Sequence, residues 1–330
     1  MFNNQLGKIL VVGGAGYIGS HVVLHLLKNN YQVVVLDDLS TGTQDAVLTE
    51  HFYLGDLADR TLLKQIFSEH HIIGVMHFAA LIVVDESVSK PLEYYQNNFI
   101  KPLTLLDEMI KHQIHYFIFS STAAVYGEPQ YTPVDINHPK RPMNPYGQSK
   151  LILEAALKDF DRAYGLKSTV LRYFNAAGAD PKGCIGFHEP ITHLIPQVLK
   201  AASGRKEAIT IFGNDYNTKD GTCIRDYIHV MDLASAHILA FEQLLSTKYS
   251  HTYNLGNGQG FSVLEVIESV KKITKKDIKV IQSNRRAGDP AILIADSSDA
   301  KKNLNWQPQF NQLDQIIQDA WQWELNPKWH

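Results

Sequence analysis

Short apolar runs alternate with amphipathic stretches along the first half of the chain. Each run has six to eight residues rich in Val, Ile, Leu or Phe, which is typical of a strand that is buried on both faces of a sheet. The runs, in chain order, are KILVVGG, QVVVLDD, FYLGDL, GVMHFAA, YFIFSS and STVLRYFN. The stretches between them, including residues 20–30, 60–71 and 102–113, repeat apolar residues at helical spacing. This alternation predicts an α/β fold with a doubly wound parallel sheet and right-handed crossovers.

The pattern changes after Asn175. The segment AAGADPKGCIGFHEPITHLIP is rich in Gly, Pro and His, which predicts a loop. Short elements then alternate with polar connections up to LDQIIQDAWQWEL, which predicts a final helix. We therefore expect two domains, residues 1–175 and a smaller α/β domain at 176–330, with about 228–258 returning to the first.

Composition narrows the class of protein. The 330 residues are 45% apolar and 20% charged, with a net charge of −3, so neither nucleic acid nor an anionic membrane is an expected partner. The two cysteines, Cys184 and Cys223, allow no disulfide framework, and no metal site is expected. The N-terminal stretch lacks the features of a signal peptide, and no apolar run approaches the roughly 18 residues of a membrane span. These features predict a soluble cytoplasmic protein.

A glycine-rich loop follows the first predicted strand. Gly13, Gly16 and Gly19 stand in the spacing G-x-x-G-x-x-G within VVGGAGYIGSHVV, before a predicted helix. Glycines at such a place allow a tight turn and a close approach of the backbone to a pyrophosphate. The next strand ends at Asp37 and Asp38, where an acid suits a ribose 2′-hydroxyl and repels a 2′-phosphate. The pattern predicts a Rossmann-type domain that prefers NAD to NADP.

Tyr146 and Lys150 form a Y-x-x-x-K pair in NPYGQSK. They share one helix face if a helix begins near Pro145. A phenol titrates near 10, and a neighbouring cation favours the phenolate. The spacing therefore suits a tyrosine base that removes a hydroxyl proton while hydride leaves the same carbon.

Three hydroxyl residues end the predicted strand in FIFSSTAAVYG. Ser120, Ser121 and Thr122 stand where open α/β sheets bind ligands, so any of them could hydrogen-bond a reacting oxygen. The alternative is that these side chains only stabilise a turn.

Together these motifs resemble those of the extended short-chain dehydrogenase/reductases, and more closely the UDP-glucose 4-epimerase family. The segments that carry the closer resemblance are GGAGYIGSH, HFAA, ESVSKPLEYYQNN, SSTAAVYG, NPYGQSK, LRYFNAAGA, FGNDYNTKDGTCIRDYIHVMDLA, YNLGNG and RRAGDPA, from residue 13 to about 291. The resemblance implies an NAD-binding domain at 1–175 and a UDP-sugar-binding domain at 176–330. It also implies a reaction in which the sugar is oxidised transiently to a 4-keto form and reduced again on its other face.

The resemblance assigns roles to individual positions. Tyr146 matches the catalytic base, Lys150 its partner and Thr122 the hydroxyl of the triad. The NAD-binding positions, besides these three, are Gly13, Gly16, Tyr17, Ile18, Gly19, Asp37, Asp38, Leu39, Ser40, Thr41, Gly42, Asp56, Leu57, Phe78, Ala79, Ala80, Asn97 and Phe174. The UDP-sugar positions, besides Thr122 and Tyr146, are Asn175, His193, Leu194, Thr210, Ile211, Phe212, Arg225, Arg286, Asp289 and Leu293. Two arginines in the second set suit a diphosphate.

The sequence also departs from the family pattern. Ile82 stands where many members have a lysine, and Phe187 stands where an acid is common, which leaves His188 and Glu189 without an assigned role. Leu293 replaces a tyrosine that limits sugar size in some relatives, so we expect UDP-GlcNAc and UDP-GalNAc to be accepted besides UDP-glucose and UDP-galactose.

Two rival functions are weighed against an epimerase. Sugar-nucleotide dehydratases and decarboxylases of this superfamily carry acids after the strand-end hydroxyl, whereas this chain has Ala123 and Ala124. A protein that binds NAD without catalysis is disfavoured by the intact tyrosine and lysine. Family resemblance further implies a homodimer formed through helices near 97–112 and 150–165.

Overall fold

The computed structural model describes residues 7–189, 192–286 and 288–328. The first six residues, part of the stretch on which the absence of a signal peptide was predicted, lie outside the described residues. The chain forms two compact units: unit 1 is 1–125, 140–172 and 234–253, and unit 2 is 126–139, 173–233 and 254–330.

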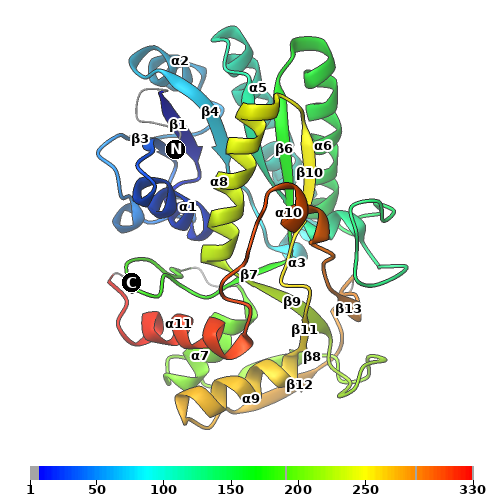
Figure 1. Cartoon of the computed structure of the whole chain (residues 1–330). Helices are drawn as coiled ribbons and strands as arrows, with labels where there is room; N and C mark the ends of the chain where they lie inside the picture. The colour runs from blue at the N-terminus through cyan, green and yellow to red at the C-terminus, as the bar shows by residue number, and fades with distance from the viewer. Residues whose placement is uncertain (1–6, 190–191, 287, 329–330) are drawn as a thin grey trace. The chain divides into compact units, whose positions relative to one another are not determined.

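Unit 1 is built on a seven-stranded sheet of strand order β10-β6-β5-β4-β1-β2-β3 (Figure 1). The strands are β1 (Lys8–Val12), β2 (Gln32–Asp37), β3 (Phe52–Leu54), β4 (Ile72–His77), β5 (Tyr116–Thr122), β6 (Lys167–Tyr173) and β10 (His251–Leu255). The pairs β1–β2, β1–β4, β2–β3 and β4–β5 are parallel. The order 3-2-1-4-5-6 is that of the Rossmann fold, so the predicted fold class is confirmed. Ligands of such sheets bind beyond the carboxyl ends of the strands, where the order reverses between β1 and β4.

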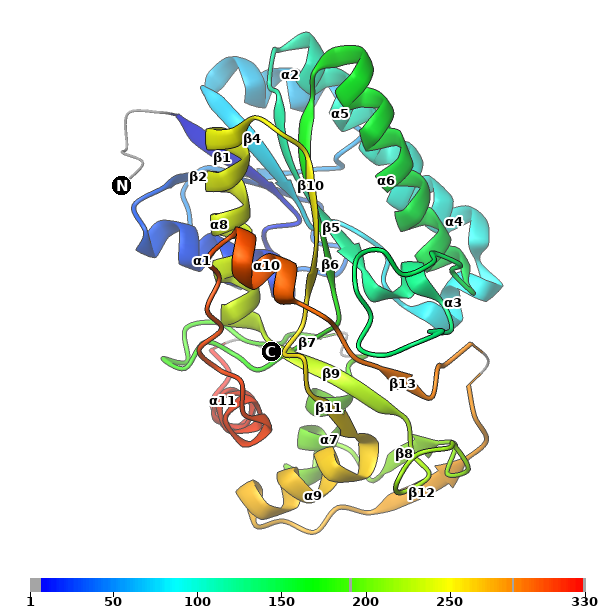
Figure 2. The same ribbon diagram turned by 45° about the vertical axis from the view of Figure 1, so that its right-hand side comes forward.

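Helices cover both faces of this sheet. They are α1 (Tyr17–Lys28), α2 (Arg60–Glu69), α3 (Val84–Ser89), α4 (Pro91–Tyr95), α5 (Lys101–Lys111), α6 (Pro145–Tyr164) and α8 (Val230–Thr247), with short turns η1 (Gln44–Ala46), η2 (Gln96–Ile100, a π-helix) and η3 (Ala123–Tyr126). α1 and α8 lie on one face, and α5 and α6 lie on the other (Figure 2). Buried apolar side chains of α2, α5 and α6 pack on those of β1 and β5.

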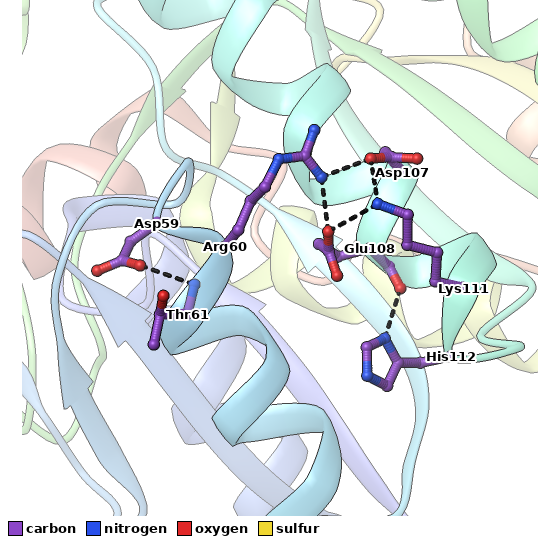
Figure 3. Close-up of polar contacts among 7 residues, drawn as sticks. All are labelled: Asp59, Arg60, Thr61, Asp107, Glu108, Lys111 and His112. Atoms are coloured by element: carbon purple, nitrogen blue, oxygen red, sulfur yellow. Dashed lines mark hydrogen bonds and ion pairs between the residues drawn. The ribbon is translucent and has the colours of Figure 1, made fainter.

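Polar contacts join the start of α2 to the end of α5 (Figure 3). Asp59 caps α2 by accepting from the backbone N–H of Thr61. Arg60 then reaches the carboxylates of Asp107 and Glu108, at 2.5 and 2.6 Å. Lys111 contacts the same two carboxylates, so the cluster holds the ends of the two helices together.

Unit 2 contains two smaller sheets. Its strands are β7 (Asn175–Ala177), β8 (Ile209–Phe212), β9 (Ile224–His229), β11 (Gly260–Ser262), β12 (Val280–Ser283) and β13 (Ile292–Leu293). β9 pairs in parallel with β7 and β13 and antiparallel with β11, and β8 pairs in parallel with β12. The segment after Asn175, which we expected to be a loop, therefore begins inside β7.

Three helices form the core of unit 2. The helices of this unit are α7 (Leu194–Ala202), α9 (Val263–Thr274), α10 (Ser298–Asn303) and α11 (Leu313–Leu325). Apolar side chains of α7, α9 and α11 pack together and on β8. Residues 126–139 belong to this unit, because the N–H of Val134 donates to the carbonyl of Ile294 at 2.7 Å. Among the described residues, no helix is both long and apolar enough to cross a membrane.

Candidate active site

The glycine loop connects β1 to α1 in unit 1. Gly13 has a φ of +81°, and a Cβ built there would lie 2.5 Å from the backbone nitrogen of Ala79. A Cβ on Gly19 would lie 2.0 Å from the carbonyl oxygen of Gly13. Gly16 is the N-cap of α1 and makes no side-chain cap hydrogen bond. Backbone N–H groups at such a terminus bind phosphates, and the tight turn fits a dinucleotide.

Asp37 fixes the shape of this loop from the end of β2. Its buried carboxylate accepts from the N–H of Ala15 at 2.8 Å and from the N–H of Leu39 at 2.9 Å. Asp37 therefore stands at the end of β2, where Rossmann folds place the acid that binds ribose hydroxyls. Asp38 is exposed and accepts from the N–H and hydroxyl of Ser40. Thr41 and Gly42 follow in the same turn.

The other predicted cofactor residues of unit 1 follow the carboxyl ends of neighbouring strands or line the loop. The N–H groups of Phe78 and Ala79 both donate to the carbonyl of Val12, which joins the end of β4 to that of β1. The remaining positions are Tyr17 and Ile18 in α1, Asp56 and Leu57 after β3, Ala80 after β4 and Asn97 in η2. Phe174 follows β6 and belongs to unit 2.

Tyr146 and Thr122 are paired in unit 1. Asn144 caps α6 by accepting from the N–H of Gly147, so the helix begins at Pro145 as predicted and Tyr146 lies in its first turn. The Thr122 oxygen accepts from the N–H of Ala124 at 3.1 Å, which leaves its proton for Tyr146. Burial raises the pKa of the Tyr146 phenol, and the hydrogen bond with Thr122 opposes that rise.

Lys150 lies one turn further along α6 and is buried. Its Nζ donates to the carbonyl of Ser120 at 2.9 Å and lies 5.0 Å from the centre of the Phe119 ring. Burial lowers the pKa of Lys150 to about 7, against the opposing effect of the Glu154 carboxylate. Burial, with a smaller contribution from the positive charge of Lys150, lowers the pKa of His77 to about 3, so that ring is neutral.

Unit 2 contains the predicted diphosphate residues. The Arg225 guanidinium, on β9, donates to Asp289 at 2.5 Å and to the carbonyl of Ile224 at 2.8 Å. Leu293 pairs with Arg225 in the register of β13 and β9. Arg286 lies over the ring of Phe212, 3.8 Å from its centre. Asp289 and Leu293 therefore lie close to Arg225.

The remaining substrate positions come from three other elements of unit 2. Thr210, Ile211 and Phe212 lie on β8, and Asn175 pairs with Tyr227 between β7 and β9. His193 is the N-cap of α7, which begins at Leu194. Burial lowers the pKa of His193 to about 4, so its ring is neutral at neutral pH.

Comparison with known proteins identifies the family. A family model described as GDP-mannose 4,6 dehydratase matches residues 10–320. A UDP-glucose 4-epimerase from Halalkalibacterium halodurans is 52% identical over 316 residues, which are 96% of this chain and 95% of that protein. The chain belongs to the UDP-glucose 4-epimerase family. The resemblance found in the sequence is thereby confirmed.

Solved structures of UDP-glucose 4-epimerases agree with this assignment. The enzyme from Brucella ovis, in complex with NAD, is 44% identical to this chain. The match covers 96% of this chain and 97% of that enzyme, with a TM-score of 0.92. The UDP-Glc/GlcNAc 4-epimerase from Campylobacter jejuni is also 44% identical. The match covers 96% of this chain and 99% of that enzyme, with a TM-score of 0.83.

In this member of the epimerase family, a buried ion pair lies beside the Tyr146–Lys150 face, and sequence analysis missed it. Glu154, one turn beyond Lys150, accepts from Arg172 at 2.5 and 2.9 Å and from the hydroxyl of Ser121 at 2.6 Å. Ser121 therefore faces Glu154, whereas Thr122 faces Tyr146. The signal for Glu154 was a charged residue beside the apolar Leu153 and Leu157 of the same helix, because charged residues are seldom buried without a partner.

Asn98 is a second residue that sequence analysis missed. Its side chain accepts from the N–H of Leu81 and donates to the carbonyl of the same residue, both at 2.9 Å. It also donates to Ser149 at 3.3 Å, which ties the segment after β4 to α6. Ile82, the departure noted in the sequence, follows this anchor and is 46% exposed.

Proposed function

We propose that the chain is a UDP-hexose 4-epimerase that interconverts UDP-glucose and UDP-galactose with bound NAD. The observation that carries the proposal is the Thr122–Tyr146–Lys150 arrangement in unit 1 of a chain that belongs to the UDP-glucose 4-epimerase family. The Brucella ovis relative contains NAD, and the glycine loop with Asp37 fits the same group. We assign NAD to unit 1 and the UDP-sugar to unit 2.

In this mechanism Tyr146 removes the proton from the C4 hydroxyl and later returns a proton to the C4 oxygen. The buried phenol is a poor base by itself, because burial raises its pKa. The Thr122 hydroxyl stabilises the phenolate by a hydrogen bond, and the ammonium form of Lys150 adds a positive charge one turn away. When bound, NAD supplies the hydride acceptor and a further positive charge.

Unit 2 would hold the nucleotide firmly and leave the sugar free to turn. Arg225 and Arg286 offer two fixed guanidinium groups, which suit the oxygens of a diphosphate. Asp289 orients Arg225 by the contact described above. A 4-keto sugar that is held only through its UDP can turn and present its other face to the reduced cofactor. The hydride then returns to C4, so the net reaction is redox-neutral.

We propose that N-acetylated sugars are also substrates, because Leu293 is shorter than the tyrosine of some relatives. The Campylobacter jejuni relative is named a UDP-Glc/GlcNAc 4-epimerase. A steric clash discriminates strongly between two substrates, whereas one methylene more or less in a pocket changes the discrimination by only about 1–3 kcal/mol. In Leu293→Tyr we expect kcat/KM for UDP-GalNAc to fall relative to that for UDP-galactose. An unchanged ratio, or a native enzyme that ignores UDP-GalNAc, would show that Leu293 is not the gate.

We also propose a cytoplasmic homodimer formed through helices near 97–112 and 150–165. Family resemblance supports the pairing, and the mass of the protein in solution, measured by light scattering, tests it. A monomer at micromolar concentration would contradict the dimer.

The experiment that tests the function is incubation of the purified protein with UDP-galactose and identification of the product. We expect UDP-glucose and no accumulation of NADH. A 4-keto-6-deoxy sugar would instead indicate a dehydratase, which Ala123 and Ala124 disfavour because both lack an acidic group. Bound NAD without turnover of any of the sugars would indicate a protein that binds NAD without catalysis.

A further inference from the structure

Tyr216 lies in the connection between β8 and β9 of unit 2, which is folded closely on itself. The N–H of Tyr216 donates to the carbonyl of Gly221 at 2.9 Å. Gly221 has a φ of +79°, and a Cβ there would lie 2.2 Å from the carbonyl oxygen of Asn214. Thr222 donates to the Asp220 carboxylate through both its N–H and its hydroxyl. These contacts give the connection one defined shape.

The Tyr216 ring is held on two sides. The Arg285 guanidinium lies 4.2 Å from the ring centre and donates to the Asp215 carboxylate at 2.7 Å. On another side, a Cβ built on Gly213 would lie 2.6 Å from the ring, so the backbone approaches it closely. Arg285 therefore clamps the ring, while the next residue, Arg286, stacks on Phe212.

The hydroxyl at the end of this ring has no hydrogen-bond partner among the described residues, although the residue is only 6% exposed. A buried hydroxyl without a partner is unfavourable, which points to a partner supplied by a ligand. Burial raises the pKa of this phenol, the negative charge of Asp289 adds to the rise, and the positive charge of Arg225 opposes it. The ring lies against Arg285, the residue before Arg286, and Arg286 itself stacks on Phe212, so Tyr216 is held next to the residues assigned to the diphosphate.

We propose that Tyr216 is a further UDP-binding residue, whose hydroxyl donates a hydrogen bond to a phosphate oxygen of the diphosphate beside Arg225. The inference rests on the proposed function, because it takes a UDP-sugar as the ligand of unit 2. Arg285 acts as a positioning residue that holds the ring through stacking and through Asp215.

Titration calorimetry of Tyr216→Phe with UDP and with uridine tests the proposal without depending on catalysis. We expect the Kd for UDP to rise roughly tenfold or more, because the lost hydrogen bond is to a charged group. Uridine, which has no phosphate, should bind the variant and the native protein equally. Without ligand, the variant should melt at the same temperature or higher, because it loses an unpartnered hydroxyl. In turnover, KM should rise with little change in kcat.

Tyr131→Phe is the matched control, because Tyr131 lies in the same unit, is 45% exposed and already donates to Asp135. It should bind UDP like the native protein. A native Kd for UDP in Tyr216→Phe, or an equal loss of uridine binding, would overturn the assignment of Tyr216 while leaving the proposed function intact. A native protein that binds no UDP at all would overturn both.

Discussion

At the scale of single residues, Tyr146 is the group on which the chemistry depends. Tyr146→Phe keeps the ring and removes the acidic proton. We expect kcat to fall by roughly 10²–10⁴-fold, as for the loss of a general base, while the Kd for UDP stays unchanged. Steady-state kinetics and UDP titration measure the two quantities. A near-native rate would mean that another group takes the proton.

Lys150 is buried, and burial disfavours its ammonium form, which makes the stability of the protein depend on pH. Its pKa is about 7 in the folded protein against an ordinary value of 10.5. Between these values the unfolded chain binds more protons than the folded one, so this lysine's contribution to the free energy of unfolding increases with pH from about 7 to 10.5. Below about pH 7 the burial of this lysine lowers the free energy of unfolding by its full amount.

We therefore expect Lys150→Met to be stabilised relative to the native protein more at pH 6.5 than at pH 9. Urea denaturation at the two pH values measures the difference in the free energy of unfolding. Lys158→Met, on an exposed position of the same helix, controls for the loss of a lysine from α6. A difference that does not change with pH would contradict the buried-cation interpretation.

Residue-scale prediction from the sequence succeeded where a pattern is local and failed where partners are distant. The spacing of Tyr146 and Lys150 placed both on one helix, as observed. Arg172 is 18 positions beyond its partner Glu154, and no spacing rule connects them. Tyr216 lies among polar residues that are typical of any loop, so its clamp by Arg285, 69 positions away, had no signal in the sequence.

At the scale of elements, the glycine loop between β1 and α1 allows two substitutions to be distinguished. In Gly19→Ala the new Cβ would lie 2.0 Å from the carbonyl oxygen of Gly13. In Gly16→Ala the nearest atom to the new Cβ would be the same oxygen, at 3.4 Å. We expect Gly19→Ala to lower the free energy of unfolding by about 1–3 kcal/mol and to abolish NAD binding. Gly16→Ala should keep the melting temperature but bind NAD more weakly, because its methyl group adds bulk beside the helix N-terminus.

Melting curves and NAD titration of the two variants separate folding from binding. Gly19→Ala with native stability would contradict the packing argument, and Gly16→Ala with native NAD affinity would show that the pyrophosphate lies elsewhere.

The elements themselves were predictable to different degrees. The apolar runs identified β1, β2, β4, β5 and β6, because buried parallel strands have continuous apolar sequences. The final helix at 313–325 was also predicted, because its apolar residues recur at helical spacing. The pairing of β8 with β12 joins Ile209 to Val280, and the sequence between them contains β9, α8 and α9. Such long-range pairing leaves no local pattern.

At the scale of the whole molecule, the chain passes between its two units several times. Residues 234–253 belong to unit 1, and they fall within the stretch of about 228–258 for which a return to the first domain is predicted. Residues 126–139 belong to unit 2 through backbone hydrogen bonds of Val134 with Ile294 and Asp296. A contact of this kind depends on the backbone, so the side-chain pattern of 126–139 did not indicate it. The assignment of NAD to one unit and UDP-sugar to the other remains our proposal.

The central claim is that hydride leaves C4 and returns to C4 of the same sugar. The most direct test uses UDP-galactose deuterated at C4, with the product analysed by NMR and mass spectrometry in ordinary water. The account predicts UDP-glucose that retains the deuterium at C4, without net formation of NADH. Loss of the deuterium to solvent, or its accumulation in released reduced cofactor, would contradict the account.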